Sequence, residues 1–225
     1  MNNIVLLGPP GAGKGSIAVL LSKALELPHI STGAIFRDEI SAQTPLGIEA
    51  DSYIKNGALV PDHLTNRIIA GRLTKPDCDR GFILDGYPRS AVQAQVLSDM
   101  LELWQRELRA AILIEASEEI IIKRLSRRHV CSLCALNYNY DPEEVEAKAI
   151  KCKVCGGSLK RREDDKIDAI RNRLKIYDEL SKPLIDFYEQ RHKLYRVVNA
   201  ERSLAETSRI ILEHLGEKVP EELML

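Results

Sequence analysis

Short apolar runs bounded by turn residues alternate with longer amphipathic stretches along the chain. Such runs are typical of strands that are buried on both faces of a parallel sheet. The predicted strands are Ile4–Leu7, His29–Ser31, Phe82–Asp85, Ala111–Glu115 and Tyr195–Val198. The predicted helices include Lys14–Leu25, Ala91–Leu108, Glu118–Arg127 and Lys166–Arg191. This alternation predicts an α/β fold with a doubly wound, parallel five-stranded sheet and with ligands at the carboxyl ends of its strands.

Two segments interrupt this alternation. Residues 32–60 contain short helical patterns with Gly and Pro between them, which indicates a small inserted helical flap. Residues 128–163 have no clear periodicity, so we expect a loop-like lid that something other than an apolar core organises. The remaining residues, 1–31, 61–127 and 164–225, are expected to form the core domain.

The last long helical pattern carries an apolar stripe at helical spacing. We expect this stripe, formed by Ile167, Ile170, Leu174 and Tyr177, to be buried in the core. Cys78 stands apart from the other cysteines and is interpreted as a small packing residue. We assign no role to four of the histidines, His29, His63, His192 and His214.

Composition places the chain among ordinary globular proteins. Of its 225 residues, 44% are hydrophobic and 29% are charged, and the formal net charge is -1, which argues against a general nucleic-acid binder. The chain begins without the pattern of a signal peptide, and no apolar run is long enough to span a membrane. We therefore expect a cytoplasmic protein, a monomer, with neither membrane nor nucleic acid as partner.

A glycine-rich loop follows the first predicted strand and precedes a helix. Its sequence is Gly8-Pro9-Pro10-Gly11-Ala12-Gly13-Lys14-Gly15-Ser16, which has the context that a phosphate-binding P-loop requires. Backbone N–H groups of such a loop surround phosphates, and the helix N-terminus adds partial positive charge. We expect Lys14 to reach the β- and γ-phosphates and Ser16 to bind phosphate or support Mg²⁺. The alternative is a glycine-rich turn without a ligand.

A second cluster of polar residues begins where the predicted strand Phe82–Asp85 ends. Asp85 is suited to holding Mg²⁺ through water, and the alternative is a turn-forming role before Gly86. Arg89 follows, and Gln93 lies one helical turn further on. The amide of Gln93 can both donate and accept hydrogen bonds, as reading a purine edge requires.

Four cysteines in the lid have the spacing of a zinc site. Cys131 and Cys134 are separated by two residues, as are Cys152 and Cys155, with seventeen residues between the pairs. Four thiolates form a closed tetrahedral Zn²⁺ site, which is structural rather than catalytic. The alternatives are four unliganded thiols, or iron in place of zinc in a recombinant preparation.

Together these motifs resemble the adenylate kinase family, in particular its long-lid bacterial type with a four-cysteine zinc lid. The resemblance rests on the P-loop with Gly-Lys-Gly, the triplet Ser31-Thr32-Gly33, Arg37, the block Asp85-Gly86-Tyr87-Pro88-Arg89 with Gln93, and Arg162-Glu163-Asp164-Asp165 with Arg173. Order and spacing agree over essentially the whole chain. The resemblance implies a P-loop kinase fold and Mg²⁺-dependent phosphoryl transfer between ATP and AMP, giving two ADP.

The resemblance also implies roles for individual residues. The AMP site would comprise Thr32, Arg37, Ala58, Leu59, Val60, Gly86, Tyr87, Pro88, Arg89, Gln93, Arg162 and Arg173. The ATP site would comprise Gly11, Ala12, Gly13, Lys14, Gly15, Ser16, Arg124, Arg128, Asn137, Tyr138 and Arg202. The catalytic groups would be Lys14, Asp85, Arg89, Arg128, Arg162 and Arg173.

Three positions depart from the family pattern. Ala34 stands where the family has an acidic residue, Arg127 where it has glycine, and His129 where it has arginine. Thr32 favours adenine, because similar kinases of pyrimidine monophosphates tend to have alanine there. Two alternatives remain: a kinase of UMP or CMP, and a nucleotide-gated switch or zinc-dependent nucleic-acid module, which the local charge of about +6 between Lys123 and Arg162 makes conceivable.

Overall fold

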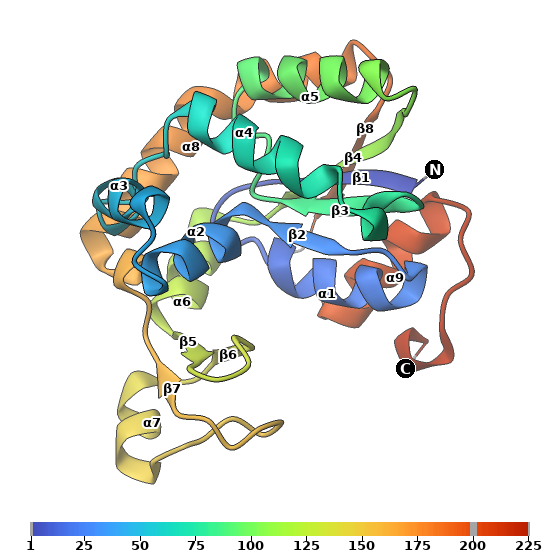
Figure 1. Ribbon diagram of the computed structural model, residues 1–225. Helices are drawn as coiled ribbons and strands as arrows, with labels where there is room; N and C mark the ends of the chain where they lie inside the picture. Colours follow the sequence, from blue (N-terminus) through green and yellow to red (C-terminus); the bar gives the residue numbers. More distant parts are fainter. Residues whose placement is uncertain (1, 199–201, 225) are drawn as a thin grey trace.

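A parallel five-stranded sheet forms the centre of the protein in the computed structural model, which describes residues 2–198 and 202–224 (Figure 1). The strand order is β2-β3-β1-β4-β8. The strands are β1 (Asn2–Leu7), β2 (His29–Ser31), β3 (Gly81–Asp85), β4 (Leu108–Glu115) and β8 (Leu194–Val198). The predicted fold class is confirmed, and each predicted strand lies within an observed one.

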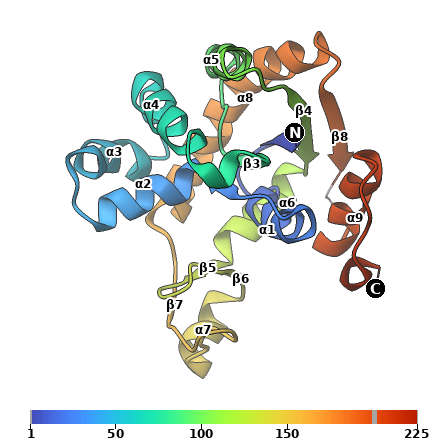
Figure 2. The same cartoon turned by 45° about the vertical axis from the view of Figure 1, so that its right-hand side comes forward.

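Helices cover both faces of the sheet, because consecutive residues of its central strands point to opposite sides. Ile4 and Leu6 of β1 pack in a core that includes side chains of two helices, α1 (Lys14–Leu25) and α9 (Leu204–His214). Val5 and Leu7 face the second core, which includes side chains of α4 (Asp62–Leu73), α5 (Ala91–Leu103) and α8 (Ile167–Glu189). The same two layers are visible in Figures 1 and 2.

The inserted flap consists of two helices, α2 (Thr32–Ser41) and α3 (Pro45–Lys55). It has a small apolar core of its own, formed by Phe36, Ala50, Val60 and Leu64. In Figure 2 the flap projects to the left of the sheet, on the side opposite α9. The flap begins directly after β2 and ends just before α4. The connection between its two helices is largely exposed.

The lid is more ordered than the sequence analysis expected. It contains a three-stranded antiparallel sheet of order β6-β5-β7 and one short helix. These elements are β5 (Arg128–Cys131), β6 (Asn137–Asn139), α7 (Pro142–Lys148) and β7 (Leu159–Lys160). The prediction of a loop-like segment was wrong because strands this short do not show a hydrophobic period. Figure 1 shows the lid below the main sheet, at the end of α6 (Glu118–Ser126).

Two further expectations are corrected. Helix α5 ends at Leu103 rather than Leu108, because Gln105 adopts a left-handed backbone with φ of 53° and Leu108 begins β4. Ile167 is 65% exposed, since it is the first residue of α8 and precedes the part that packs, whereas Ile170 is buried. Leu174 and Tyr177 are half-buried. Cys78 is fully buried in the core, as expected.

Short 3₁₀ turns complete the structure at Pro76–Cys78, Glu163–Asp165 and Glu221–Leu223. Among the described residues, no helix has both the length and the apolar character needed to cross a membrane.

Candidate active site

The P-loop connects β1 to α1 at the carboxyl edge of the sheet. The Lys14 ammonium folds back into it, where Nζ donates hydrogen bonds to the carbonyl oxygens of Gly8 at 2.7 Å and Pro9 at 2.8 Å. Burial and nearby arginines lower the pKa of Lys14 to about 8, although Asp85 opposes the shift. Lys14 thus carries its charge among several cations, where an anionic ligand would be strongly favoured.

Gly15 explains the Gly-Lys-Gly form of this loop. A Cβ at this position would lie 3.2 Å from Oδ2 of Asp85, at the end of β3, so a side chain there would crowd the carboxylate. Burial alone would raise the pKa of Asp85, but the neighbouring His29 imidazole and the charge of Lys14 keep it below its usual value. Asp85 is therefore an ionised oxygen ligand beside the phosphate loop, which fits a hydrated Mg²⁺.

His29 is a site residue that the sequence analysis missed. Its Nε2 lies 3.5 Å from Oδ2 of Asp85. The pairing of β2 with β3 brings the two residues together, because it places Ser31 opposite Asp85, with His29 two residues earlier on the same strand face; the sequence alone does not give this register.

Five predicted arginines converge near Lys14 from different parts of the chain. Arg37 comes from α2, Arg89 follows β3, Arg128 begins β5, Arg162 precedes the turn Glu163–Asp165, and Arg173 lies on α8. Burial lowers the pKa of four of them, Arg37, Arg89, Arg162 and Arg173, and further lowering comes from neighbouring arginines. The pKa of Arg162 falls to about 9. Guanidinium groups that depress one another's pKa values share one region, and the carboxylates there offset their mutual repulsion only in part.

Two carboxylates hold part of this cluster together. Asp165 is 1% exposed and accepts from Arg128, whose Nε is 2.7 Å from its Oδ2. Nη1 of Arg173 lies 3.0 Å from Oδ2 of Asp164 and 3.4 Å from Oδ1 of Asp165. Asp164 and Asp165 were not among the predicted site residues. They orient guanidinium groups that can exchange a carboxylate for a phosphate.

A second set of predicted site residues lies near the start of α5 and is joined by hydrogen bonds. Thr32 Oγ1 donates to the carbonyl of Gly86 at 2.9 Å, and Nε of Arg89 donates to the same oxygen at 2.9 Å. Tyr87 is buried, and its hydroxyl donates to Oδ1 of Asn66 at 2.8 Å. Gln93 is buried as well. Hydrogen bonds thus connect residues that were predicted to bind AMP, and Pro88 lies between two of them, Tyr87 and Arg89.

The loop after α3 carries the other predicted AMP residues. Ala58 and Leu59 are half-buried, and Val60 belongs to the flap core. This loop rests on α8, because Nδ2 of Asn172 donates to the carbonyl of Asn56 at 2.6 Å.

The residues predicted to surround the ATP base are only partly brought together. Arg124 on α6 reaches the P-loop, with Nη1 3.4 Å from the carbonyl of Ala12. Asn137 accepts from Nη2 of Arg162 at 2.9 Å, and Tyr138 stacks on Tyr140. Arg202 instead contacts the carbonyl of Val198 at 2.8 Å, at the start of α9, while residues 199–201 beside it lie outside the described residues.

The departures from the family pattern have identifiable contacts. Ala34 donates its backbone N–H to the Ser31 hydroxyl that caps α2. Arg127, at the end of α6, pairs with Asp141 at 3.0 Å and so ties that helix to the start of α7. His129 is buried, with Nδ1 3.1 Å from the carbonyl of Arg127.

The four lid cysteines meet in space and fit a zinc ion. All four sulfur atoms lie within 4.8 Å of one another, and the pairs Cys131–Cys155 and Cys134–Cys152 are 3.4 and 3.5 Å apart. Tetrahedral ligation with Zn–S bonds of about 2.3 Å requires sulfur atoms about 3.8 Å apart. The Tyr138 hydroxyl lies 3.1 Å from Sγ of Cys152, a contact that the sequence did not reveal.

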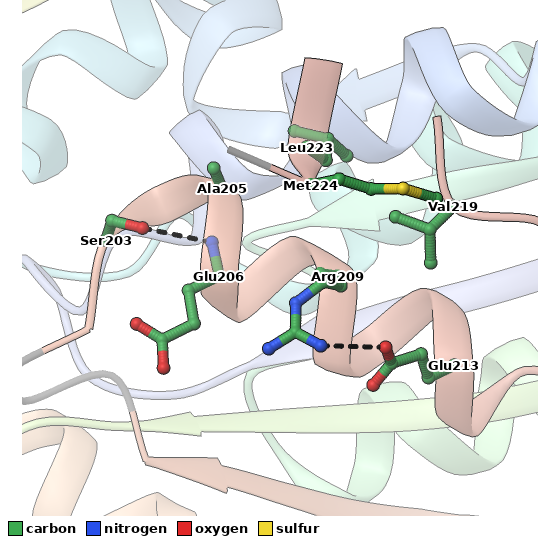
Figure 3. A pocket seen from close by; sticks show the side chains of 8 residues that line it. All are labelled: Ser203, Ala205, Glu206, Arg209, Glu213, Val219, Leu223 and Met224. Carbon is green, nitrogen blue, oxygen red and sulfur yellow. Dashed lines mark hydrogen bonds and ion pairs between the residues drawn. The ribbon is translucent and has the colours of Figure 1, made fainter. Parts of the chain in front are cut away.

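A different hollow lies between α9 and the C-terminal turn (Figure 3). Its polar side chains are already paired, since Ser203 caps the helix at Glu206 and Arg209 contacts Glu213 at 2.9 Å. It contains none of the predicted site residues.

The parallel sheet, the P-loop with its lysine and the converging arginines define a P-loop kinase. A model of the adenylate kinase family matches residues 6–193. The adenylate kinase of Thermosipho melanesiensis is 49% identical over 197 residues, covering 87% of this chain and 91% of the relative. That of Clostridium botulinum strain Hall is 45% identical over 215 residues, covering 95% and 98%. That of Fervidobacterium nodosum is 44% identical over 214 residues, covering 95% and 97%. The chain belongs to the adenylate kinase family and is a nucleoside monophosphate kinase.

Proposed function

We propose that the enzyme reversibly transfers the γ-phosphoryl group of ATP to AMP, giving two ADP, and that it serves nucleotide homeostasis. One observation carries the assignment of the site: Lys14 and five arginines from separate elements form one cluster at the P-loop, and burial and neighbouring arginines lower the pKa values of Lys14, Arg37, Arg89, Arg162 and Arg173. Two nucleotides that meet by their phosphates would supply the negative charge that such a cluster lacks.

On this proposal, the enzyme accelerates the reaction by positioning the two nucleotides and by neutralising the charge of their phosphates. The accepting phosphate oxygen is already ionised at neutral pH, so the reaction needs no general base. Lys14 would hold the β- and γ-phosphates, and Arg128, Arg162 and Arg173 would surround the group in transfer. Asp85 and Ser16 would hold Mg²⁺, which supplies charge neutralisation on the phosphates when bound.

The AMP site is proposed at the start of α5 and in the flap. Gln93 would read the base, and Arg37 and Arg89 would bind the phosphate. We propose residues 32–60 as the AMP flap, residues 128–163 as the lid and the remainder as the core. Closure of flap and lid over both nucleotides would exclude water, which otherwise could accept the phosphoryl group.

The lid is proposed to hold one structural Zn²⁺ through Cys131, Cys134, Cys152 and Cys155. The support is the sulfur geometry together with the few apolar side chains that the lid buries, chiefly that of Val145. We further propose a cytoplasmic monomer whose partners are its nucleotide substrates.

A coupled assay with ATP and AMP tests the proposal, with Lys14→Ala as the impaired variant. We expect ADP formation by the wild type and a loss of at least about a hundredfold in the variant. Full activity of Lys14→Ala would refute the assigned site. A panel of AMP, UMP, CMP and GMP as acceptors decides the substrate, and a preference for UMP or CMP would refute AMP.

A further inference from the structure

The side-chain amide of Gln93 is held at both of its ends by the protein. Its Oε1 accepts the backbone N–H of Arg89 at 2.7 Å, and its Nε2 donates to Oδ1 of Asp62 at 2.6 Å. Gln93 is 2% exposed, so water does not compete for these bonds. Asp62 is the first residue of α4 and is not among the predicted site residues.

These two partners fix which way the amide faces. A backbone N–H can only donate, and an ionised carboxylate can only accept. Rotation of the amide by 180° would place Nε2 against the N–H of Arg89 and Oε1 against the carboxylate of Asp62. Both contacts would be repulsive in a buried site, whereas a glutamine without such partners can adopt either orientation.

Arg89 and Asp62 each use one of the two hydrogen bonds that Oε1 and Nε2 of Gln93 can form. An amide oxygen accepts two hydrogen bonds and an amide nitrogen donates two, so one acceptor and one donor are left for a ligand. Adenine presents an N6 donor beside an N1 acceptor, whereas guanine presents an O6 acceptor beside an N1–H donor. The order of the two groups is therefore reversed between the two bases.

We propose that Asp62 is a specificity-determining positioning residue, which locks Gln93 in the orientation that accepts a 6-aminopurine and rejects a 6-oxopurine. This inference rests on the proposed function, in which Gln93 reads the base of the acceptor nucleotide. Asp62 acts through Gln93 and need not touch the nucleotide. Without the carboxylate, only the backbone N–H of Arg89 opposes rotation of the Gln93 amide, so the orientation that suits a 6-oxopurine costs less.

The test compares Asp62→Asn and Asp62→Leu with the wild type. The asparagine amide can itself face either way, and leucine removes the acceptor while keeping a similar size. A matched control is Asp99→Asn, because Oδ1 of Asp99 also accepts from a glutamine, Gln95, at 2.6 Å, but on the exposed side of α5. Gln93→Ala tests the underlying assignment.

The measured quantities are the dissociation constants of AMP and GMP by calorimetry, and kcat and KM for AMP. We expect the ratio of GMP to AMP dissociation constants to fall about threefold in Asp62→Asn and about tenfold in Asp62→Leu. KM for AMP should rise while kcat stays close to wild type. Asp99→Asn should match the wild type in every quantity.

The outcomes distinguish failure of the Asp62 lock from failure of the proposed base site. If Gln93→Ala loses the discrimination while both Asp62 variants keep it, the lock is refuted and the AMP site stands. If Gln93→Ala keeps the discrimination, the assignment of the base site is refuted. A purely structural effect of Asp62 at the start of α4 would lower the melting temperature and weaken both nucleotides equally, which also refutes the lock.

Discussion

The Lys14 ammonium provides a direct test of the phosphate cradle, because its pKa of about 8 lies in an accessible range. Burial lowers this pKa first, and Arg89, Arg173 and Arg128 lower it further. Phosphates of ATP would favour the charged form and raise the pKa in the complex. ATP binding should therefore take up a proton above pH 8, and ATP affinity should fall as the pH rises through the pKa of the ligand-free enzyme.

The magnitude follows from the titration curve. With a pKa of about 8, Lys14 is about 90% protonated at pH 7 and about 10% protonated at pH 9. If only the ammonium form binds the phosphates, the dissociation constant of ATP weakens about tenfold across this interval. Proton uptake per bound ATP rises from about 0.1 at pH 7 to about 0.9 at pH 9.

Isothermal titration calorimetry in buffers of different ionisation enthalpy measures both quantities. Lys14→Arg is the control, since a guanidinium at this position stays charged over this range and removes the part of the proton uptake that comes from Lys14. The control also separates Lys14 from Arg162, whose lowered pKa of about 9 would affect both proteins equally. A dissociation constant independent of pH in the wild type, with no proton uptake at pH 9, would refute the placement of Lys14 against the phosphates.

Three further perturbations test other parts of the site. Asp165→Asn should lower the free energy of unfolding by about 3 kcal/mol, because the half-buried Arg128 and Arg173 lose a shared anion; a loss under about 1 kcal/mol in urea denaturation contradicts this. Gly15→Ala should reduce kcat/KM about tenfold without lowering the melting temperature, since its Cβ crowds Asp85; steady-state kinetics at several Mg²⁺ concentrations measure this, and wild-type rates would disprove it. A strong chelator should release one zinc per chain and remove the protection of lid amides from hydrogen exchange, while the sheet stays protected; unchanged lid exchange after zinc release would argue against a structural metal.

The architecture was predictable from sequence because buried parallel strands and their helices carry strong, local patterns. Helix α1 and strand β2 have the predicted bounds, and the P-loop lies where the motif placed it. The end of α5 was not predictable, because Gln105 takes a left-handed backbone without the glycine that usually signals it. The lid strands are two to four residues long, too short for any period to be read.

The chemical groups of the site were predictable as residues, but their pairing was not. Arg89, Gln93 and Asp85 were found because they share one motif. Asp62 lies 31 positions before Gln93 and is joined to it only by the packing of α4 on α5. Long-range pairs of this kind follow from tertiary structure, and a single sequence contains no signal for them.

The described cations and carboxylates of the site are unequal in number. Six cations, Lys14 and the five arginines, face three carboxylates that each interact with more than one of them, Asp85, Asp164 and Asp165. The carboxylates keep the cations close enough to be useful, but they neutralise only half of the positive charge. The remaining charge attracts phosphates. A site with fewer acids would push its arginines apart, and one with more would compete with ATP and AMP, so the partial neutralisation is itself suited to the proposed binding of both nucleotides together.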